Sequence, residues 1–351
     1  MDTSSHREVR SLEPTHTLAD YVSALEKALA QDGPALGCGP VHSKSVHSDI
    51  SLLVATSGST GVPKEIALTS SALLASARAS NKYLKANKGD TWSLLLPLTH
   101  IAGINVLVRA MQLETSPIDL RNHNGAYPHA DFTAIVPTQL FTALNENSEL
   151  LKHLQGAKAV LVGGASLSPE LRAQGVAAGI NVVATYGMSE TCGGCIYDGV
   201  ALDGVNFEIS SDGRIKISGP VLAEVERENG WFVTNDLGKI NEGKLLVIGR
   251  SDDVIISGGE NISLSAIETE INKKFPDLLV AAFATTDSKW GQALHVAVQT
   301  QDTNITTQIA DALVSAIGNH AKPKSVILLD KLPQISIGKV DRFSLAKLVS
   351  E

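Results

Sequence analysis

The chain has 351 residues, 43% hydrophobic and 19% charged, with a formal net charge of −8, a balance typical of a globular protein of two or more domains. The negative charge disfavours nucleic-acid binding, which needs clustered Lys and Arg, and three cysteines are too few for a disulfide framework. Because no secretory signal follows Met1 and no apolar stretch approaches the roughly 20 residues that cross a bilayer, we expect a cytoplasmic protein without membrane insertion.

The first 200 residues alternate between predicted helices and strands. A helix is predicted over 17–30 and a Gly- and Pro-rich segment over 33–40; an apolar strand over 50–55 leads into a glycine-rich loop and then a helix over 70–86. Further buried strands are predicted over 92–96, 132–136, 159–162 and 182–185, with helices between them, as at 138–144 and 169–178. This order predicts an α/β fold in which helices flank a mainly parallel sheet.

The pattern changes after about residue 200. Short alternating strands separated by Gly and Asp predict a β-rich subdomain, with strands over 207–209, 214–217, 231–234 and 245–248. From residue 251 the pattern predicts a compact α+β unit, with helices over 264–275 and 305–317 and strands over 279–284, 293–299 and 325–329. We therefore expect a large N-terminal domain over 1–250 and a small C-terminal domain over 251–351.

The glycine-rich loop runs from Thr56 to Lys64 and reads Thr-Ser-Gly-Ser-Thr-Gly-Val-Pro-Lys. Its glycines let the backbone approach an anion closely, its hydroxyls add donors and Lys64 adds a positive charge, which together suit a polyphosphate. The segment follows the strand–loop–helix order of phosphate-binding loops, although it lacks the Gly-Lys-Ser/Thr ending of a Walker A motif. A flexible Ser/Gly turn is the alternative.

Five segments resemble, in order, motifs of the adenylate-forming superfamily, which contains acyl-CoA and aryl-CoA synthetases, peptide-synthetase adenylation domains and luciferases. They are the glycine-rich loop, Tyr186–Thr191, Thr234–Gly238, Gly249–Ile262 and Ile337–Arg342. The resemblance implies a mobile C-terminal domain and an enzyme that uses ATP and Mg²⁺ to activate an acid as an acyl-adenylate. Since no carrier-protein domain follows residue 351, we expect CoA as the acceptor.

The resemblance also assigns the ATP-binding residues. It implies phosphate binding by Thr56, Ser57, Gly58, Ser59, Thr60, Gly61, Lys64 and Ser189, adenine binding by Gly164, Ala165 and Tyr186, and ribose binding by Asp236 and Arg250. Gly187 is also assigned to the ATP site. Glu190 would hold the Mg²⁺ directly and Thr60 would reach it through phosphate, since Mg²⁺ prefers oxygen ligands. A core aromatic is the alternative for Tyr186, and a plain turn for 163–165. Ser189 and Asn235 replace the family's usual Thr and Gly.

The C-terminal motifs receive three further roles from the resemblance. Lys339 would reach the active site and stabilise negative charge at the α-phosphate, with an ordinary solvent-exposed lysine as the alternative. Asp252 falls at the hinge about which the family rotates its small domain between adenylation and thioester formation. Ser257, Gly258 and Gly259 would line the path of CoA, with a tight turn as the alternative.

The acid is predicted to bind along Leu96–Arg109, which resembles the family's Pro-Leu-x-His-x-x-Gly segment. His100 would form part of the acyl pocket and act in catalysis, or else be a structural histidine, and Gly187 and Met188 would line the pocket. Arg109 lies in an otherwise apolar predicted helix. Because a buried arginine is costly unless it contacts an anion, we expect Arg109 to bind a negatively charged group of the acid. A position on the solvent-exposed face of the helix is the alternative. An arginine here resembles that of the o-succinylbenzoate–CoA ligases of the menaquinone pathway, which implies a second carboxylate on the acid.

Two other features bear on this hypothesis. Cys192 and Cys195 form a CxxC pair without a second pair, which favours small pocket-lining residues over a metal or redox site. Only 55 residues precede the loop, an abbreviation typical of short actinobacterial members of the o-succinylbenzoate group. Whether a partner replaces the missing surface, and whether the chain forms a homodimer, stay open. The alternative functions are another aryl- or acyl-CoA synthetase and a non-catalytic nucleotide-binding regulator.

Overall fold

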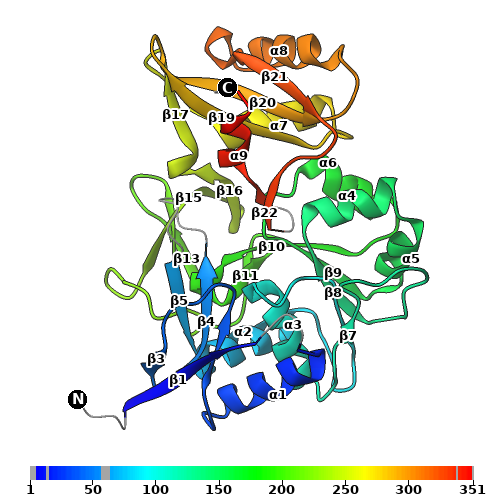
Figure 1. Cartoon of the computed structure of the whole chain (residues 1–351), viewed down its shortest axis with the longest axis vertical. Coiled ribbons are helices and arrows are strands. Elements are labelled where there is room, and N and C mark those ends of the chain that lie inside the picture. The colour runs from blue at the N-terminus through cyan, green and yellow to red at the C-terminus, as the bar shows by residue number, and fades with distance from the viewer. Residues whose placement is uncertain (1–4, 13–15, 57–63, 337–338, 350–351) are drawn as a thin grey trace. The chain divides into compact units, whose positions relative to one another are not determined.

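The computed structural model describes residues 5–12, 16–56, 64–336 and 339–349 and forms two compact units (Figure 1). The first comprises residues 1–164, 175–208 and 216–233, and the second residues 165–174, 209–215 and 234–351. Helices and β-sheets build the chain together, so the predicted α/β fold class is confirmed. The domain boundary at residue 250 and the mobility of the C-terminal domain stay predictions. No helix in the described ranges combines the length and hydropathy that crossing a bilayer requires.

A five-stranded sheet with the strand order β3-β1-β2-β4-β5 opens the first unit. Its elements are β1 (His6–Ser11), α1 (Leu18–Leu29), β2 (Ala35–Cys38), β3 (Ser45–His47), β4 (Ile50–Thr56) and β5 (Lys64–Thr69). Strands β1, β2 and β4 run parallel, and β5 returns antiparallel to β4. The segment predicted as Gly- and Pro-rich thus contains strand β2, all four of whose residues are buried.

A seven-stranded sheet follows, in the order β12-β11-β10-β9-β8-β6-β7. Its strands are β6 (Trp92–Leu94), β7 (Ile118–Asp119), β8 (Phe132–Ile135), β9 (Ala159–Val162), β10 (Val182–Met188), β11 (Gly193–Tyr197) and β12 (Val200–Ala201). The strands from β10 to β7 are all parallel, whereas β11 and β12 are antiparallel additions. The predicted mainly parallel sheet is therefore confirmed.

Helices connect these strands. They are α2 (Ser70–Tyr83), α3 (Ile101–Gln112), α4 (Pro137–Asn145), α5 (Ser148–Gly156) and α6 (Pro169–Ala177). The side chain of Thr69 caps α2 by accepting a hydrogen bond from the Ala72 amide at 3.2 Å, and Pro137 occupies the first turn of α4, where no amide donor is needed. Helices α2 and α3 contact each other and strand β11, so this helix pair packs against the antiparallel part of the sheet (Figure 1).

The β-rich subdomain predicted after residue 200 is confirmed as a four-stranded sheet in the order β13-β14-β15-β16. Its strands are β13 (Asn206–Ile209), β14 (Arg214–Ser218), β15 (Phe232–Asn241) and β16 (Lys244–Arg250). Strands β15 and β16 form an antiparallel hairpin whose register places Asp236 opposite Arg250. The hairpin therefore brings together two residues that lie 14 positions apart in the sequence.

The rest of the second unit is an α+β structure, as predicted. Its sheet has the order β18-β17-β20-β19, with β21 beside β20. Its elements are β17 (Val254–Ser257), β18 (Glu260–Ser263), α7 (Leu264–Lys274), β19 (Val280–Asp287), β20 (Gly291–Gln299), α8 (Ile305–Ala316), β21 (Ser325–Leu329), β22 (Gln334–Ser336), β23 (Lys339–Val340) and α9 (Arg342–Lys347). Apolar side chains of α7 and α8, such as Ile267 and Ile309, share one core with Val296 of β20.

A buried histidine makes the stability of the second unit depend on pH. His295 on β20 is 4% exposed, its Nδ1 lies 2.7 Å from Ser325 Oγ, its Nε2 lies 3.0 Å from Thr285 Oγ1, and its ring stacks on Phe283. Burial, and then the positive charge of Lys324, lower the pKa of His295.

We expect the free energy of unfolding to fall as the pH drops below about 6.5, because the unfolded chain then takes up a proton that the folded His295 disfavours. The thermal midpoint should accordingly decline between about pH 7.5 and about pH 5.5. His295→Leu should flatten this decline, whereas His320→Gln, at an exposed position of the same unit, should not. An unchanged slope in the His295→Leu protein would contradict the prediction.

Candidate active site

The carboxyl ends of the parallel strands bring several predicted site residues to one edge of the seven-stranded sheet. His100 follows β6, Gly163 and Gly164 follow β9, and the segment from Tyr186 to Glu190 ends β10. Ligands of open α/β sheets usually bind at this edge, because the loops that leave the strands meet there. The first unit therefore gathers His100, Gly164, Tyr186, Gly187 and Glu190, whereas Ala165, also predicted to contact adenine, belongs to the second unit.

The glycine-rich loop joins two antiparallel strands. Thr56 ends β4, Lys64 begins β5, and Thr56 Oγ1 donates a hydrogen bond to the Lys64 carbonyl oxygen at 3.0 Å. The predicted strand–loop–helix order is wrong, because the alternation that buries Ile66 and Leu68 builds strand β5 between the loop and α2. The helix N-terminus thus lies about 20 Å along β5 from the loop and cannot contribute to phosphate binding there. The predicted phosphate ligands Ser57, Gly58, Ser59, Thr60 and Gly61 lie outside the described residues.

Glu190 lies in the 3₁₀ turn η2 (Ser189–Thr191), which follows β10. The turn is fixed by the fully buried Thr191, whose Oγ1 accepts from the Met188 amide at 2.9 Å and donates to the Gly193 carbonyl at 2.8 Å. Glu190 is half-buried, and no hydrogen bond or ion pair joins its carboxylate to another described residue. A single open carboxylate fits Mg²⁺, which keeps waters and phosphate oxygens as its other ligands.

The residues predicted to contact adenine follow β9 and end β10. Glycine is required at Gly163, because a Cβ there would lie 2.0 Å from Thr185 Oγ1. Gly164 has a φ of +80°, a left-handed conformation that favours glycine, and Ala165 after it is exposed. Tyr186 and Ser189 are half-buried. Nucleotide binding by these residues stays a prediction.

Gly187 lies on β10, where it pairs with Gly194 of β11. A Cβ at this position would stand 2.0 Å from the Gly193 carbonyl oxygen and 2.7 Å from Gly194 Cα. Neither backbone atom can move without parting the two strands, so we expect Gly187→Ala to lower the free energy of unfolding by about 3 kcal/mol.

Urea unfolding can measure this loss, with Gly156→Ala as the matched control. A Cβ on Gly156 would meet only His129 Nδ1, at 3.7 Å, so this variant should match the parent protein. Equal stability of the two variants would show that β10 and β11 can separate at low cost.

The predicted ribose and hinge residues form one hydrogen-bonded cluster in the second unit. Arg250 Nη1 donates to Asp236 Oδ1 at 3.1 Å, while Nε and Nη2 of Arg250 donate to the two oxygens of Asp252, both at 2.7 Å. This two-point contact lowers the pKa of Asp252 and raises that of Arg250. Asp236 is only 8% exposed. Arg250 thus connects the predicted hinge residue Asp252 to the predicted ribose-binding residue Asp236. The motifs assign these two residues separate roles and do not predict this connection.

The predicted CoA loop is a two-residue hairpin turn between β17 and β18. Gly258 and Gly259 have φ values of +61° and +88°, which few residues other than glycine adopt in such turns. Ser257 and Glu260 are the paired residues that flank them. The ring of Trp290, which is 50% exposed, would lie 2.8 Å from a Cβ on Gly258. The tight turn is confirmed, contact with CoA stays a prediction, and sequence reasoning did not single out Trp290.

Lys339 begins β23, where its backbone pairs with Ser336 of β22; its side chain lies outside the described part of the chain. Three residues later Arg342 forms ion pairs of 2.8 Å with both Asp253 and Glu268. Asp253 adjoins the predicted hinge residue, so these ion pairs join the lysine motif to the hinge segment within the second unit. Catalysis by Lys339 stays a prediction.

His100 precedes helix α3, and Gly103 lies in the first turn of that helix. His100 is half-buried, and its Nδ1 lies 2.9 Å from Thr99 Oγ1. A Cβ on Gly103 would stand 2.3 Å from the Pro97 carbonyl oxygen, which explains the glycine of this segment by close packing. A role for His100 in the acyl pocket stays a prediction.

Arg109 is buried, so its alternative placement on the wet face of the helix is wrong. Its side chain comes from α3, and the residue is 4% exposed. Nη2 donates to the Tyr197 hydroxyl at 3.1 Å, and the guanidinium carbon lies 5.2 Å from the centre of the Trp92 ring. Within the described ranges no carboxylate pairs with Arg109, and its Nε is buried without a hydrogen-bond partner. A buried cation without a counter-charge is costly, so this arrangement suits an anionic ligand group.

The CxxC pair belongs to the core beside α2 and α3. Cys192 and Cys195 are fully buried, and the Cys192 carbonyl accepts hydrogen bonds from Asn105 Nδ2 at 2.7 Å and Ser76 Oγ at 3.1 Å. Burial raises the pKa of both thiols, that of Cys195 to about 12. A redox or metal-binding thiol needs a lowered pKa, which disfavours both alternatives. Among the described residues, no group of three or more His, Cys, Asp or Glu side chains is arranged so that it could hold a metal ion.

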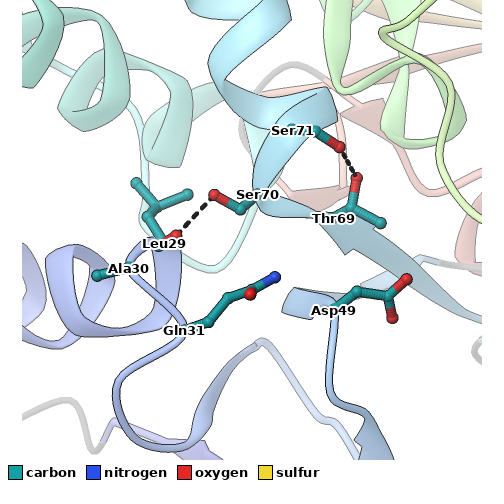
Figure 2. A pocket seen from close by; sticks show the side chains of 7 residues that line it. All are labelled: Leu29, Ala30, Gln31, Asp49, Thr69, Ser70 and Ser71. Atoms are coloured by element: carbon teal, nitrogen blue, oxygen red, sulfur yellow. Dashed lines mark hydrogen bonds between the residues drawn. The ribbon is translucent and has the colours of Figure 1, made fainter.

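A surface pocket of about 350 Å³ lies away from these residues (Figure 2). It is lined by Leu29, Ala30, Gln31, Asp49, Thr69, Ser70 and Ser71. Ser70 Oγ donates to the Leu29 carbonyl at 2.7 Å, and the Thr69 and Ser71 hydroxyls are 3.0 Å apart. The pocket lies at the N-terminus of α2, at the far end of β5 from the glycine-rich loop, and contains none of the predicted site residues.

Comparisons with known proteins agree with this arrangement. A sequence model of the AMP-binding enzyme family matches residues 3–227. A probable 2-succinylbenzoate–CoA ligase of Mycobacterium tuberculosis H37Rv is 34% identical over 362 residues, which cover 92% of this chain and 94% of that protein. The 2-succinylbenzoate–CoA ligase of Listeria monocytogenes EGD-e is 27% identical, with coverage of 83% and 68%.

Solved structures show the same fold. The o-succinylbenzoate CoA synthetase of Bacillus subtilis, in complex with the acyl-adenylate intermediate OSB-AMP, superposes with a TM-score of 0.71 at 22% identity and covers 96% of this chain and 82% of its own. ATP-bound MatB of Rhodopseudomonas palustris gives a TM-score of 0.74 at 20% identity, with coverage of 97% and 83%.

The chain therefore belongs to the AMP-binding enzyme family. Its resemblance to the o-succinylbenzoate–CoA ligases within that family is confirmed by the M. tuberculosis and L. monocytogenes relatives.

Proposed function

We propose that the protein is an ATP- and CoA-dependent ligase that converts 2-succinylbenzoate to 2-succinylbenzoyl-CoA through an acyl-adenylate, a step of menaquinone biosynthesis. Its family and its ligase relatives support the reaction class. The choice of acid rests on Arg109, whose guanidinium is buried and has no carboxylate partner among the described residues. A second carboxylate on the substrate would supply the missing negative charge. Since ATP and CoA are cytoplasmic co-substrates, we place the reaction in the cytoplasm.

The first half-reaction joins the acid to AMP. Attack of the carboxylate builds up negative charge at the α-phosphate, and we assign its stabilisation to Lys339. Lys64, at the end of the glycine-rich loop, would neutralise the phosphates that leave as pyrophosphate. Glu190 would hold Mg²⁺, which supplies further positive charge to the phosphates. Asp236 would accept hydrogen bonds from the ribose hydroxyls while Arg250 holds its carboxylate in place.

The second half-reaction joins the thiol of CoA to the acyl group and releases AMP. The turn at Gly258 and Gly259 presents no side chain that would obstruct a narrow pantetheine arm. We assign the change between the two half-reactions to the segment at Asp252, whose carboxylate is held by Arg250 on the β15–β16 hairpin. His100, Gly187 and Met188 would surround the activated carboxylate, and Arg109 would hold the other one.

ATP–pyrophosphate exchange across a panel of acids tests this proposal. The panel contains 2-succinylbenzoate, its two monoacid analogues that each lack one carboxylate, benzoate and a medium-chain fatty acid. We expect 2-succinylbenzoate to support exchange at the lowest concentration. Faster exchange with benzoate or the fatty acid would identify another aryl- or acyl-CoA synthetase. ATP binding without exchange for any acid would identify a non-catalytic regulator.

A further inference from the structure

A buried tyrosine supports Arg109 from the side of the antiparallel strands. Tyr197 on β11 is 0% exposed, and its hydroxyl lies 3.1 Å from Arg109 Nη2 and 2.9 Å from Ser80 Oγ on α2. Because a guanidinium can only donate, the Tyr197 oxygen accepts from Arg109 and keeps its own proton available for Ser80. Three elements, α2, α3 and β11, thus meet in one hydrogen-bonded chain.

Further contacts fix this chain in place. The Tyr83 ring packs edge-on against the Tyr197 ring at 5.2 Å, and Asn81 Nδ2 donates to the Arg109 carbonyl at 3.1 Å. The Trp92 ring lies beside the guanidinium at 5.2 Å. Nη2 is therefore occupied by Tyr197 and one side of the group by Trp92, whereas Nε has no hydrogen-bond partner in the described part of the chain.

We propose that Tyr197 is a positioning residue that sets the preference for acids with a second carboxylate. It holds Nη2 so that the guanidinium keeps one orientation, with its other N–H groups left to donate to the remote carboxylate. This inference rests on the proposed function. Without the phenol oxygen the long arginine side chain would keep its charge but lose its fixed direction, and a carboxylate gains most from a donor that is already aligned.

The neighbouring Asn105 lies on the same face of α3, one turn before Arg109. Its Nδ2 donates to the Cys192 carbonyl at 2.7 Å, and a Cβ on Gly193 would stand 2.3 Å from that nitrogen. The distance between α3 and β11 is therefore set at Asn105 as well as at the Arg109–Tyr197 pair. Tyr197 can thus lose its hydroxyl without releasing the helix, which makes Tyr197→Phe an informative variant.

The experiment compares acids rather than total activity. In Tyr197→Phe we expect the KM for 2-succinylbenzoate to rise about 10-fold, the loss typical of one hydrogen bond to a charged group, with kcat and the KM for ATP close to those of the parent protein. The monoacid analogue that still supports exchange should keep its KM. Tyr83→Phe is the matched control, because it removes a phenol hydroxyl from the same ring pair without touching Arg109.

Two further variants protect the test against a simple folding defect. Ser80→Ala removes the other partner of the Tyr197 hydroxyl and should raise the KM for the diacid about 2-fold to 3-fold. In an Arg109→Met background, Tyr197→Phe should add no further loss for the diacid, because there is no guanidinium left to position. An additional loss of similar size in that background, or an equal loss for diacid and monoacid, would show a merely structural tyrosine and overturn the inference.

The outcomes separate this inference from the proposed function. If the parent protein shows no preference for 2-succinylbenzoate over its monoacid analogues, the proposed substrate is wrong. If the parent protein has that preference and Tyr197→Phe retains it unchanged, the substrate stands and the role of Tyr197 is wrong.

Discussion

Replacing Lys339 with alanine is expected to reduce adenylation by at least about 10³-fold, the largest effect that we predict for one side chain. The reason is that negative charge accumulates on the α-phosphate in the transition state, and an ammonium group would stabilise it more than it stabilises bound ATP. ATP–pyrophosphate exchange with 2-succinylbenzoate measures this step alone.

The second half-reaction provides the internal control for Lys339→Ala. Thioester formation from chemically prepared acyl-adenylate and CoA should remain within about 3-fold of the parent rate, because the α-phosphate then departs as AMP without being attacked by the acid. Lys347→Ala, at a lysine of the terminal helix α9 that follows β23, should leave both half-reactions unchanged. Equal losses in the two half-reactions would contradict a role confined to adenylation.

Replacing Arg109 with methionine is expected to raise the KM for 2-succinylbenzoate about 100-fold, as is typical when one partner of a buried charge pair is removed. The monoacid analogue should be affected far less, because it has no second carboxylate to lose. Steady-state kinetics with both acids gives the ratio. Arg78→Met, at an exposed arginine of α2, is the matched control and should leave the ratio unchanged.

The stability of Arg109→Met separates a ligand-binding arginine from a structural one. The guanidinium gains one charged hydrogen bond from Tyr197 and the contact with Trp92, which together contribute about 4 kcal/mol. Removing a guanidinium from water costs a similar amount or more. We therefore expect the free energy of unfolding without acid to stay the same or rise by about 1–2 kcal/mol. A large loss of stability with an unchanged ratio of acids would identify Arg109 as a structural residue.

Much of the fold could be predicted because buried strands and amphipathic helices leave strong patterns. The four buried strands of the parallel sheet and the α+β order after residue 251 fall where the sequence places them. Strand β5 could not be recognised, because its alternation spans only six residues and directly follows the glycine-rich loop. Strand β2 could not be predicted for a different reason. Gly37 and Gly39 lie in or next to it, and glycines are typical of turns rather than of buried strands.

The sequence predicts which residues belong to the candidate site more fully than it predicts which of them contact one another. The family resemblance assigns Asp236 and Arg250 to ribose binding and Asp252 to the hinge, but only the structure shows that one guanidinium contacts both carboxylates. Arg109 was identified by an elementary argument, a charge in an apolar helix. Its supporting tyrosine lies 88 residues away on β11, and no local pattern could have linked the two.

The most direct test of the proposed activity is the product itself. The purified protein would be incubated with ATP, Mg²⁺, CoA and 2-succinylbenzoate, and the mixture analysed by mass spectrometry. We predict 2-succinylbenzoyl-CoA together with AMP in equal amount. Absence of this thioester under conditions where another acid is converted to its CoA ester, or release of ADP in place of AMP, would contradict the proposal.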